Sequence, residues 1–447
     1  MSCAWNRDSS CRVLAIAVAV GVFNLCSAAS GVRHADAGDW RSFQNGGRPE
    51  VVKADCPTEW SPESGIVWER SLAGYGQSSP VIAQGQVYVT SLAGDLKETL
   101  FIEAFDLKSG KRNWKVDAKN SSPQENNGYV SKAAPTPVCD DTGVIALFEG
   151  GNILSLSAEG KVRWQRDLVA EYGPIKSRHG LAASLEQNDE LVFVWIERQD
   201  EPYVLALSKQ TGKTLWKAEG LGVTSWSSPR LVPVGDGQHL ILSGIGKLAG
   251  LDPQTGKRLW EFDGIAGNST PTPVPLGDGR FLIGATVGRG ESGGGTAAAS
   301  NGVLEISGST ADGYSVTYLW HAKEATSSFG SPIAHRGLAW FVNRSGVLFA
   351  LDLQTGEEKL AKRTASSIWA TPLASGDKVY LFGKNGVTTI LNSGTDFAVI
   401  AENRLWNEES SSSSDPTGGG QPTLYAAAAA DGLLILRRGD RLFMVGE

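Results

Sequence analysis

Several kinds of functional residue are scarce in this chain. Its 447 residues include only 5 Cys and 5 His, and no C-x-x-C or C-x-x-C-H motif occurs, so zinc ribbons and covalently attached haem have no support. The net charge is −7, and the sequence contains no run of basic residues. Nucleic-acid binding would need a basic stripe, so that class of function is disfavoured.

Long apolar runs are also missing, and the N-terminal run is too short to span a bilayer comfortably. Arg7 and Arg12 precede this run, which covers residues 13–25, and the small residues 27–29 follow it. The pattern predicts a secretory signal peptide over 1–29. We therefore expect an exported protein, periplasmic or extracellular, without a transmembrane segment.

A lipid anchor is not expected at Cys26, because Phe-Asn-Leu before it is a poor match to the small-residue box of a lipidated cysteine. Residues 30–64 are predicted to form an N-terminal arm.

The chain does contain a recurring nine-residue sequence motif, called here the phrase. Each copy opens with Asp or Ser, continues through Thr-Gly or Ser-Gly, and ends in a bulky apolar residue. The four copies are DLKSGKRNW (106–114), SKQTGKTLW (208–216), DPQTGKRLW (252–260) and DLQTGEEKL (352–360). A shorter copy, SAEGKVRW, ends at Trp164. Recurrence every 40–50 residues or so is typical of a repeat architecture.

The phrase is predicted to be a hairpin. A carboxylate at its first position can accept a hydrogen bond from the backbone two residues on; Asp106, Asp252 and Asp352 hold this position. Glycine falls where a bulged hairpin needs a left-handed residue; these are Gly110, Gly212, Gly256 and Gly356. Burying the closing indole contributes roughly 2–3 kcal/mol, and its N–H needs a partner. We therefore expect each tryptophan to seal a seam between two sheets.

The complete unit begins at Ser/Thr-Pro, as in SSPVIAQGQVYV (78–89) and TPLASGDKVYLF (371–382). It has four strands of period-2 alternation separated by Gly, Asn and Asp turns. The closing position recurs at Trp68, Trp114, Trp164, Trp216, Trp260, Trp320, Leu360 and Trp406.

The first and last repeat units are both incomplete, and each lacks the part that the other contains. The copy in GIVWERSL (65–72) has no strands of its own before it, and the unit at 424–447 stops where its phrase should start. Closing a ring with a shared blade repairs both and leaves no exposed sheet edge. We predict an all-β fold, a single eight-bladed β-propeller of four-stranded antiparallel blades, closed by the N-terminal strand. The propeller covers 65–447, with blades at about 78–117, 134–167, 181–218, 226–263, 269–322, 329–363, 369–407 and 422–446 plus 65–71.

Two cysteines remain after the predicted cleavage. Cys56 is expected near blade eight and Cys139 in blade two, so we expect them to stay unpaired, although an oxidising compartment permits a disulfide. The stretch GRGESG (288–293) matches G-x-G-x-x-G by letter, but the phosphate-binding version needs a following helix. Since GGGTAAASNG and another strand follow, we predict a long hairpin loop.

The A-x-D-x-x-TG-K-x-x-W phrase, as at 350–360 and 249–260, resembles the PQQ-like (quinoprotein-type) propeller repeat family. The W-R-x-F-x-x-G of 40–46 is similar to exported bacterial members of it. The resemblance implies one of two activities. One branch contains dehydrogenases that hold pyrroloquinoline quinone and Ca²⁺ and carry adjacent cysteines, which this chain lacks. The other contains non-enzymatic outer-membrane assembly proteins similar to BamB.

Function is expected in the loops that join one blade's outer strand to the next blade's inner strand, because these converge on the channel. The candidate ligand- or partner-binding residues are Tyr75, Gln77, Tyr129, Lys132, Arg178, His179, Trp226, Asn268, Phe329 and Trp369. The mixture suits a peptide, a carbohydrate or an anionic small molecule. Equally, Trp226 and Trp369 can simply pack the rim, and His179 and Arg178 can be ordinary loop residues.

We identify no catalytic or metal-binding residues and expect no cofactor. The sequence favours a monomeric, non-catalytic binding or scaffold protein of the cell envelope, with a protein, small-molecule or carbohydrate partner. The alternative is a pyrroloquinoline-quinone-dependent dehydrogenase of alcohols or sugars, with calcium.

Overall fold

The computed structural model describes residues 38–51, 55–126, 131–222, 225–265, 270–286, 294–394, 396–407 and 422–446. The predicted signal peptide (1–29) and Cys26 lie outside these residues, as do Tyr129 and Asn268. No helix in the described ranges has the length and apolar character needed to cross a membrane.

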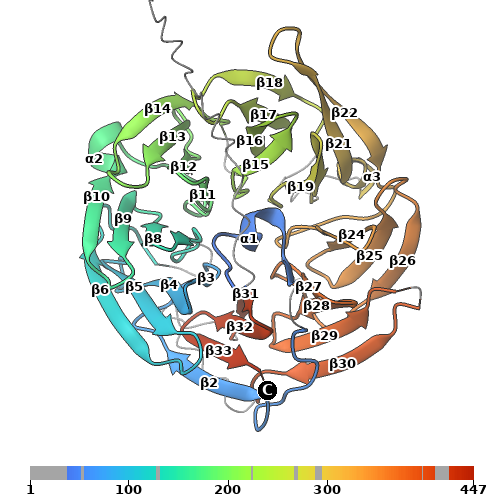
Figure 1. Ribbon diagram of the computed structural model, residues 1–447, viewed down its shortest axis with the longest axis horizontal. Coiled ribbons are helices and arrows are strands. Elements are labelled where there is room, and N and C mark those ends of the chain that lie inside the picture. The colour runs from blue at the N-terminus through green and yellow to red at the C-terminus, as the bar shows by residue number, and fades with distance from the viewer. Residues whose placement is uncertain are drawn as a thin grey trace, which may run out of the picture. The chain divides into compact units, whose positions relative to one another are not determined.

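The described strands form eight sheets arranged in a ring, called blades 1 to 8 in chain order, and the four strands that each blade repeats pair antiparallel (Figure 1). Blade 1 contains β3 (Val81–Ala83), β4 (Gln86–Ala93), β5 (Thr99–Asp106) and β6 (Arg112–Lys119). Blade 2 contains β7 (Val138–Asp140), β8 (Gly143–Leu147), β9 (Asn152–Ser157) and β10 (Val162–Asp167). Blade 3 contains β11 (Glu186–Gln187), β12 (Leu191–Ile196), β13 (Tyr203–Ser208) and β14 (Thr214–Glu219). Blade 4 contains β15 (Arg230–Val234), β16 (Gly237–Gly244), β17 (Lys247–Leu251) and β18 (Arg258–Phe262).

The second half of the ring repeats this order from an inner strand at the axis to an outer strand at the rim. Blade 5 contains β19 (Val274–Gly277), β20 (Arg280–Ile283), β21 (Gly302–Ser309) and β22 (Gly313–His321). Blade 6 contains β23 (Ile333–His335), β24 (Leu338–Val342), β25 (Val347–Asp352) and β26 (Glu358–Arg363). Blade 7 contains β27 (Leu373–Ser375), β28 (Lys378–Phe382), β29 (Val387–Asn392) and β30 (Val399–Arg404). Blade 8 contains β31 (Leu424–Ala430), β32 (Leu433–Arg438), β33 (Arg441–Val445) and β2 (Ile66–Ser71).

The ring closes through the N-terminal strand. β2 pairs antiparallel with β33, in a register that joins Ile66 to Val445 and Ser71 to Arg441. The predicted all-β propeller of eight blades, and its closure by a shared blade, are therefore confirmed. Because the first and last segments of the propeller share one sheet, blade 8 holds the two ends of the ring together.

Burial follows strand position within each blade. β12 is buried at every residue, whereas the outer strand β6 alternates between exposed and half-buried residues. Apolar clusters lie between neighbouring blades and combine, for example, strands of blades 2 and 3. Middle strands such as β12 are therefore continuous apolar runs because both of their faces are covered, whereas the outer strands keep one face in solvent.

The repeated phrase forms a turn that receives a tryptophan from the preceding blade. The indole N–H of Trp68 donates to the carbonyl of Leu107 over 3.0 Å, and its ring packs on Gly110 (φ 63°), where a Cβ would lie 2.5 Å from Cδ2. The Asp106 carboxylate accepts from the backbone N–H of Ser109 within the same turn. The same inter-blade bond joins Trp114 to Ala158, Trp164 to Lys209, Trp216 to Pro253 and Trp320 to Leu353.

The other copies show the same turn and two variations. The carboxylates of Asp252 and Asp352 each accept two backbone N–H bonds in their turns. The left-handed glycines of the remaining phrases are Gly212, Gly256 and Gly356. Trp260 instead donates to Nδ1 of His239 in its own blade, and Trp406 packs against Phe443.

One sequence expectation needs correction. A short helix, α3 (Gly294–Ala299), follows the glycine-rich stretch 288–293, where we expected only a loop; consecutive alanines, the strongest helix formers, explain it. A second, α2 (Leu168–Tyr172), follows β10 and is capped by Asp167. Cys56 contacts blade 7 through its backbone, which bonds Ser375 and Tyr380, and its side chain belongs to an apolar cluster that also contains Leu434 of blade 8. Cys56 and Cys139 are separate buried thiols.

Blade 7 also departs from the predicted four strands. The arm contributes β1 (Glu50–Val51), which pairs in parallel with β27 and extends this sheet to five strands at the axis of the ring. Just before it, α1 (Gln44–Gly47) lies at the centre of the ring (Figure 1). Residues 38–51 of the predicted N-terminal arm thus run into the axis of the propeller (Figure 1).

Candidate functional site

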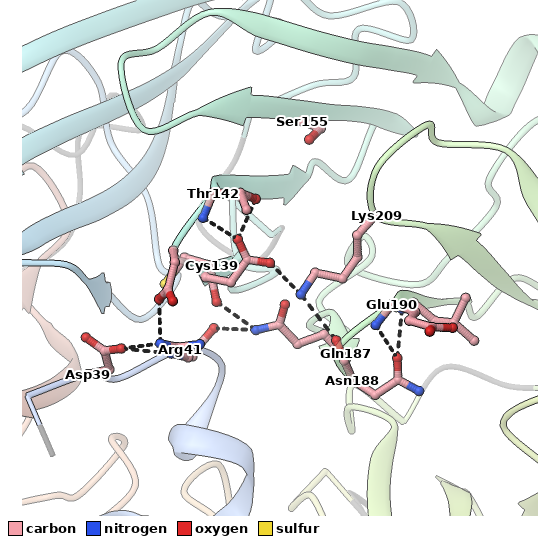
Figure 2. A network of polar contacts seen from close by, with 12 residues as sticks. Asp39, Arg41, Cys139, Thr142, Ser155, Gln187, Asn188, Glu190 and Lys209 are labelled. Atoms are coloured by element: carbon pink, nitrogen blue, oxygen red, sulfur yellow. Dashed lines mark hydrogen bonds and ion pairs between the residues drawn. The ribbon is translucent and has the colours of Figure 1, made fainter. Parts of the chain in front are cut away.

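The arm enters the axis along blades 1 to 3. Trp40 forms a bridge with Ile82 through two backbone hydrogen bonds of 2.8 Å. The Arg41 carbonyl accepts from the Cys139 backbone N–H (2.9 Å) and from Nε2 of Gln187 (3.2 Å). Figure 2 shows this network, in which the Arg41 side chain reaches Asp39.

The network continues outward from the arm. The Arg41 guanidinium also bonds Asp141 of blade 2 over 2.6 Å. Asp140 pairs with Lys209 over 2.5 Å, and Lys209 donates to the carbonyl of Asn188 over 3.2 Å. The entry of the arm is therefore tied to the inner ends of two blades by both backbone and charge.

α1 is a left-handed turn at which the arm reverses. Four consecutive residues have positive φ: Gln44 (55°), Asn45 (48°), Gly46 (69°) and Gly47 (84°). Such a run is costly for most residues, but Asn and Gly tolerate it. The sequence Asn-Gly-Gly therefore permits a tight reversal inside the ring.

A buried ion pair in blades 3 and 4 holds this turn. Arg230 pairs with Glu186 over 2.8 Å, and both side chains are at least 95% buried. Nη2 of Arg230 donates to the carbonyl of Phe43 (3.0 Å) and to Oε1 of Gln44 (3.3 Å). Burial raises the pKa of Glu186, and the neighbouring charge of Arg230 opposes that rise.

The arm leaves along blades 6 and 7. The Pro49 carbonyl accepts from the Ala374 N–H over 2.9 Å, and Glu50 contacts His335 over 3.3 Å. The hydrogen bond with His335 lowers the pKa of Glu50. Residues 38–51 thus enter and leave beside the hairpin ends of the inner strands, and their apex closes the axis from that side.

A cavity, called here the cup, lies above the apex. It holds about 780 Å³ of empty space, including its opening to solvent. Its floor comes from the arm, through Trp40, Phe43, Gln44 and Pro49. Its wall comes from the segments that begin the inner strands, namely Gln77, Ser79, Ala134, Thr136, Ala182, Ser184, Trp226, Ser228, Thr270, Thr272, Phe329, Trp369, Thr371, Pro372, Leu373, Tyr425, Ala426 and Ala427.

The wall contains a circular series of hydroxyls. Between successive blades from blade 1 to blade 7, the N–H of one Ser or Thr donates to the hydroxyl of the next, over 2.9–3.1 Å. From blade 1 to blade 7 the members are Ser79, Thr136, Ser184, Ser228, Thr272, Ser331 and Thr371. In blade 8, Ala426 occupies the register that Thr371 holds in blade 7. The Ser/Thr-Pro repeat thus joins the blades around the axis.

Aromatic side chains stand above this series. The rings of Trp226 and His179 lie 5.9 Å apart, and those of Phe329 and Trp369 lie 4.9 Å apart. Lys384 places Nζ 4.2 Å from the centre of the Trp369 ring. Both Trp226 (φ 64°) and His179 (φ 65°) have left-handed backbones, which for an aromatic residue is a rare, strained state.

A buried acid holds the strained turn. The Glu197 carboxylate accepts from the Trp226 N–H (3.1 Å), the Ser225 N–H (3.2 Å) and the Ser225 hydroxyl (2.6 Å). Burial raises the pKa of Glu197 to about 7. Trp226 is therefore oriented from behind by a group that titrates near neutral pH.

Of the ten predicted site residues, the structure brings four to the cup: Gln77, Trp226, Phe329 and Trp369. The His179 ring lies beside that of Trp226 at a tilt of 34°, whereas Arg178 is exposed and is not part of the lining. Tyr75 and Lys132 lie behind the wall, where the Lys132 Nζ is 5.5 Å from the Tyr75 ring and Tyr75 bonds the Tyr425 hydroxyl. Tyr129 and Asn268 fall outside the described residues.

Sequence reasoning missed the floor and the hydroxyl wall. The Asn-Gly-Gly of the arm was a signal for a left-handed reversal, but nothing in the sequence placed it at the axis. The recurring Ser/Thr before proline indicates the start of a strand, but it does not indicate that the hydroxyls bond to neighbouring blades. Among the described residues, no group of three or more His, Cys, Asp and Glu side chains could hold a metal ion.

Comparison with known proteins agrees with this architecture. Residues 29–174 and 200–441 match the family described as outer membrane protein assembly factor BamB. The chain belongs to this family of PQQ-like β-propellers. No curated protein sequence matches it.

Solved structures resemble this BamB-family chain in fold. BamB from Moraxella catarrhalis is 15% identical, with a TM-score of 0.56, covering 85% of this chain and 98% of that one. Quinohemoprotein alcohol dehydrogenase from Comamonas testosteroni is 12% identical, with a TM-score of 0.58, covering 92% and 81%. A europium-containing methanol dehydrogenase is 10% identical, with a TM-score of 0.57, covering 90% and 89%. Since the BamB-like and quinoprotein-like structures are about equally similar, function must be argued from the cup.

Proposed function

We propose that this protein is a non-catalytic binding protein of the cell envelope, which takes a ligand or a segment of a partner into the cup. One observation carries the proposal: the arm closes the cup at one end, and no charged side chain occurs in its described lining. A preformed pocket of aromatic and hydroxyl groups suits binding. General acid–base catalysis would require titratable groups at the reacting atoms.

The quinone-dependent alternative fits the described lining poorly. Calcium takes carboxylate and carbonyl oxygens as ligands, and a quinone that carries carboxylates needs cationic partners. The cup's lining has neither an acidic nor a basic side chain in the described residues. We therefore derive no reaction through this cofactor.

The envelope setting rests on two supports. The predicted signal peptide over 1–29 favours export, and the family is that of a protein named for outer-membrane assembly. Partner binding by the present chain is part of the proposal.

The test places a photo-crosslinking amino acid either at Phe329, an exposed rim residue, or at Leu215, which is somewhat more exposed and lies on the outer strand β14. We expect a discrete adduct with an envelope component from position 329 and none from position 215. Titration with pyrroloquinoline quinone and Ca²⁺ completes the test. Stoichiometric binding with alcohol- or sugar-dependent dye reduction would overturn the proposal.

A further inference from the structure

We propose that the cup binds the end of an uncharged saccharide chain; this inference rests on the proposed function and names its ligand class. Charge gives the first reason. A phosphate, uronate or sialate would enter a lining without a counter-charge in its described part, and desolvating an unpaired ion is expensive. An uncharged polar ligand avoids that cost.

Two preformed aromatic platforms give the second reason. Trp226 and Trp369 come from segments three blades apart, before β15 and β27, and both line the cup. Glu197 fixes the backbone of Trp226, while Phe329 and Lys384 hold the Trp369 ring. Rigid aromatic side chains offer large apolar faces at a low cost in conformational entropy. The C–H face of a sugar ring packs on such surfaces.

The polar groups of the cup give the third reason. The hydroxyls of the series that line the cup each accept a backbone N–H, so their own protons remain available to donate; these belong to Thr136, Ser184, Ser228, Thr272 and Thr371. On the floor, Gln44 is oriented by Arg230 and Thr371. The Trp40 indole N–H is buried and has no hydrogen-bond partner among the described residues, which is costly unless an acceptor reaches it. Sugar hydroxyls can both donate and accept.

The same contacts disfavour a peptide. An added peptide strand would need free backbone groups on an inner strand. At the level of the cup, the N–H groups of Ser79, Thr136, Ser184, Ser228, Thr272 and Ser331 already donate to the neighbouring blade. The inner edge of β27 is taken by β1. Because the floor closes the axis, a ligand must enter from one side and by its end.

The test screens the full chain on an array of neutral, uronate-bearing and sialylated glycans, and then measures the best neutral glycan by titration calorimetry. We expect selective binding of neutral glycans. Trp226→Ala and Trp369→Ala should each weaken binding about tenfold or more, whereas Trp226→Phe should keep much of the affinity. Leu215→Ala is the matched surface control and should bind as the parent does.

The possible results distinguish failure of the saccharide proposal from failure of the proposed binding function. A silent array, equal binding of anionic glycans, or unchanged affinity in both tryptophan variants would overturn the saccharide proposal. If the array is silent while the Phe329 crosslink to an envelope protein persists, the proposed function stands and the ligand class is wrong. Loss of both signals overturns both.

Discussion

The backbone N–H of Trp226 donates a 3.1 Å hydrogen bond to the buried carboxylate of Glu197. This bond connects a residue inside blade 3 to the strained turn that begins blade 4. It also links a titratable group to the wall of the cup, because Trp226 lines that wall. Stability and binding should therefore both respond to changes at Glu197.

The first prediction concerns pH. Burial raises the pKa of Glu197 from 4.5 to about 7, so the native state binds this proton more tightly than the unfolded state. Between these values the native state holds more protons, and the unfolding free energy should fall as pH rises, by up to about 3 kcal/mol from this group. In Glu197→Gln, which cannot ionise, the decline between about pH 5 and about pH 8 should be smaller.

Guanidinium unfolding of both proteins across this range provides the measurement. The control is Glu63→Gln, which replaces an exposed carboxyl group and should leave the parent's slope in place. An equal pH slope in parent and Glu197→Gln would rule out this role for Glu197.

The second prediction separates the effect of losing the Trp226 side chain from the effect of its strained backbone conformation. Its φ of 64° is easy for glycine and strained for alanine. Trp226→Gly should therefore be more stable than Trp226→Ala by about 1 kcal/mol. At Trp369, whose φ is not positive, the order should reverse. Thermal melting of the four variants decides the matter, and the same order at both sites would contradict the argument.

The third prediction concerns the ion pair under the arm. Arg230→Met leaves Glu186 buried without its partner and removes the contacts to Phe43 and Gln44. We expect a loss of about 3–5 kcal/mol in unfolding free energy. The double variant Arg230→Met/Glu186→Met should recover much of it, since no charge is then stranded. No recovery in the double variant would show that the arm contacts dominate.

The fourth prediction tests ring closure. Trp68 lies in the closing strand β2 and is 4% exposed, whereas its neighbour Val67 is 48% exposed. Trp68→Ala removes the contact with Gly110 and the bond to Leu107, and should cost about 3–5 kcal/mol. Val67→Ala, on the same strand, should cost little. If the two variants melt alike, β2 does not hold the ring closed.

Much of the fold could be predicted from the sequence because the patterns that determine it involve residues close together in the chain. A turn that begins with Asp106 and reaches left-handed Gly110 is decided within a few residues, and recurrence of that turn gave the number of blades. Closure also followed, since the unpaired strand at Trp68 and the incomplete last unit each lacked what the other had. Four rim residues of the cup could be predicted because the loop order of a propeller brings them together.

The floor of the cup could not be predicted from the sequence. The path of the arm depends on contacts between residues far apart in sequence, such as Arg41 with Cys139 and Gln187, or Phe43 with Arg230. No local pattern encodes such partners. The same holds for Glu197. Its raised pKa arises from burial, and no local sequence pattern indicates that this residue is buried.

The sequence by itself therefore determined the repeat, the blade count and the closing strand, because hairpin turns and strand alternation depend on neighbouring residues. Only the tertiary structure decided that residues 38–51 close the axis, that Ser and Thr hydroxyls join blades 1 to 7, and that the described lining of the cup carries no charged side chain. These features depend on which side chains meet across the ring, and packing of all eight blades sets that.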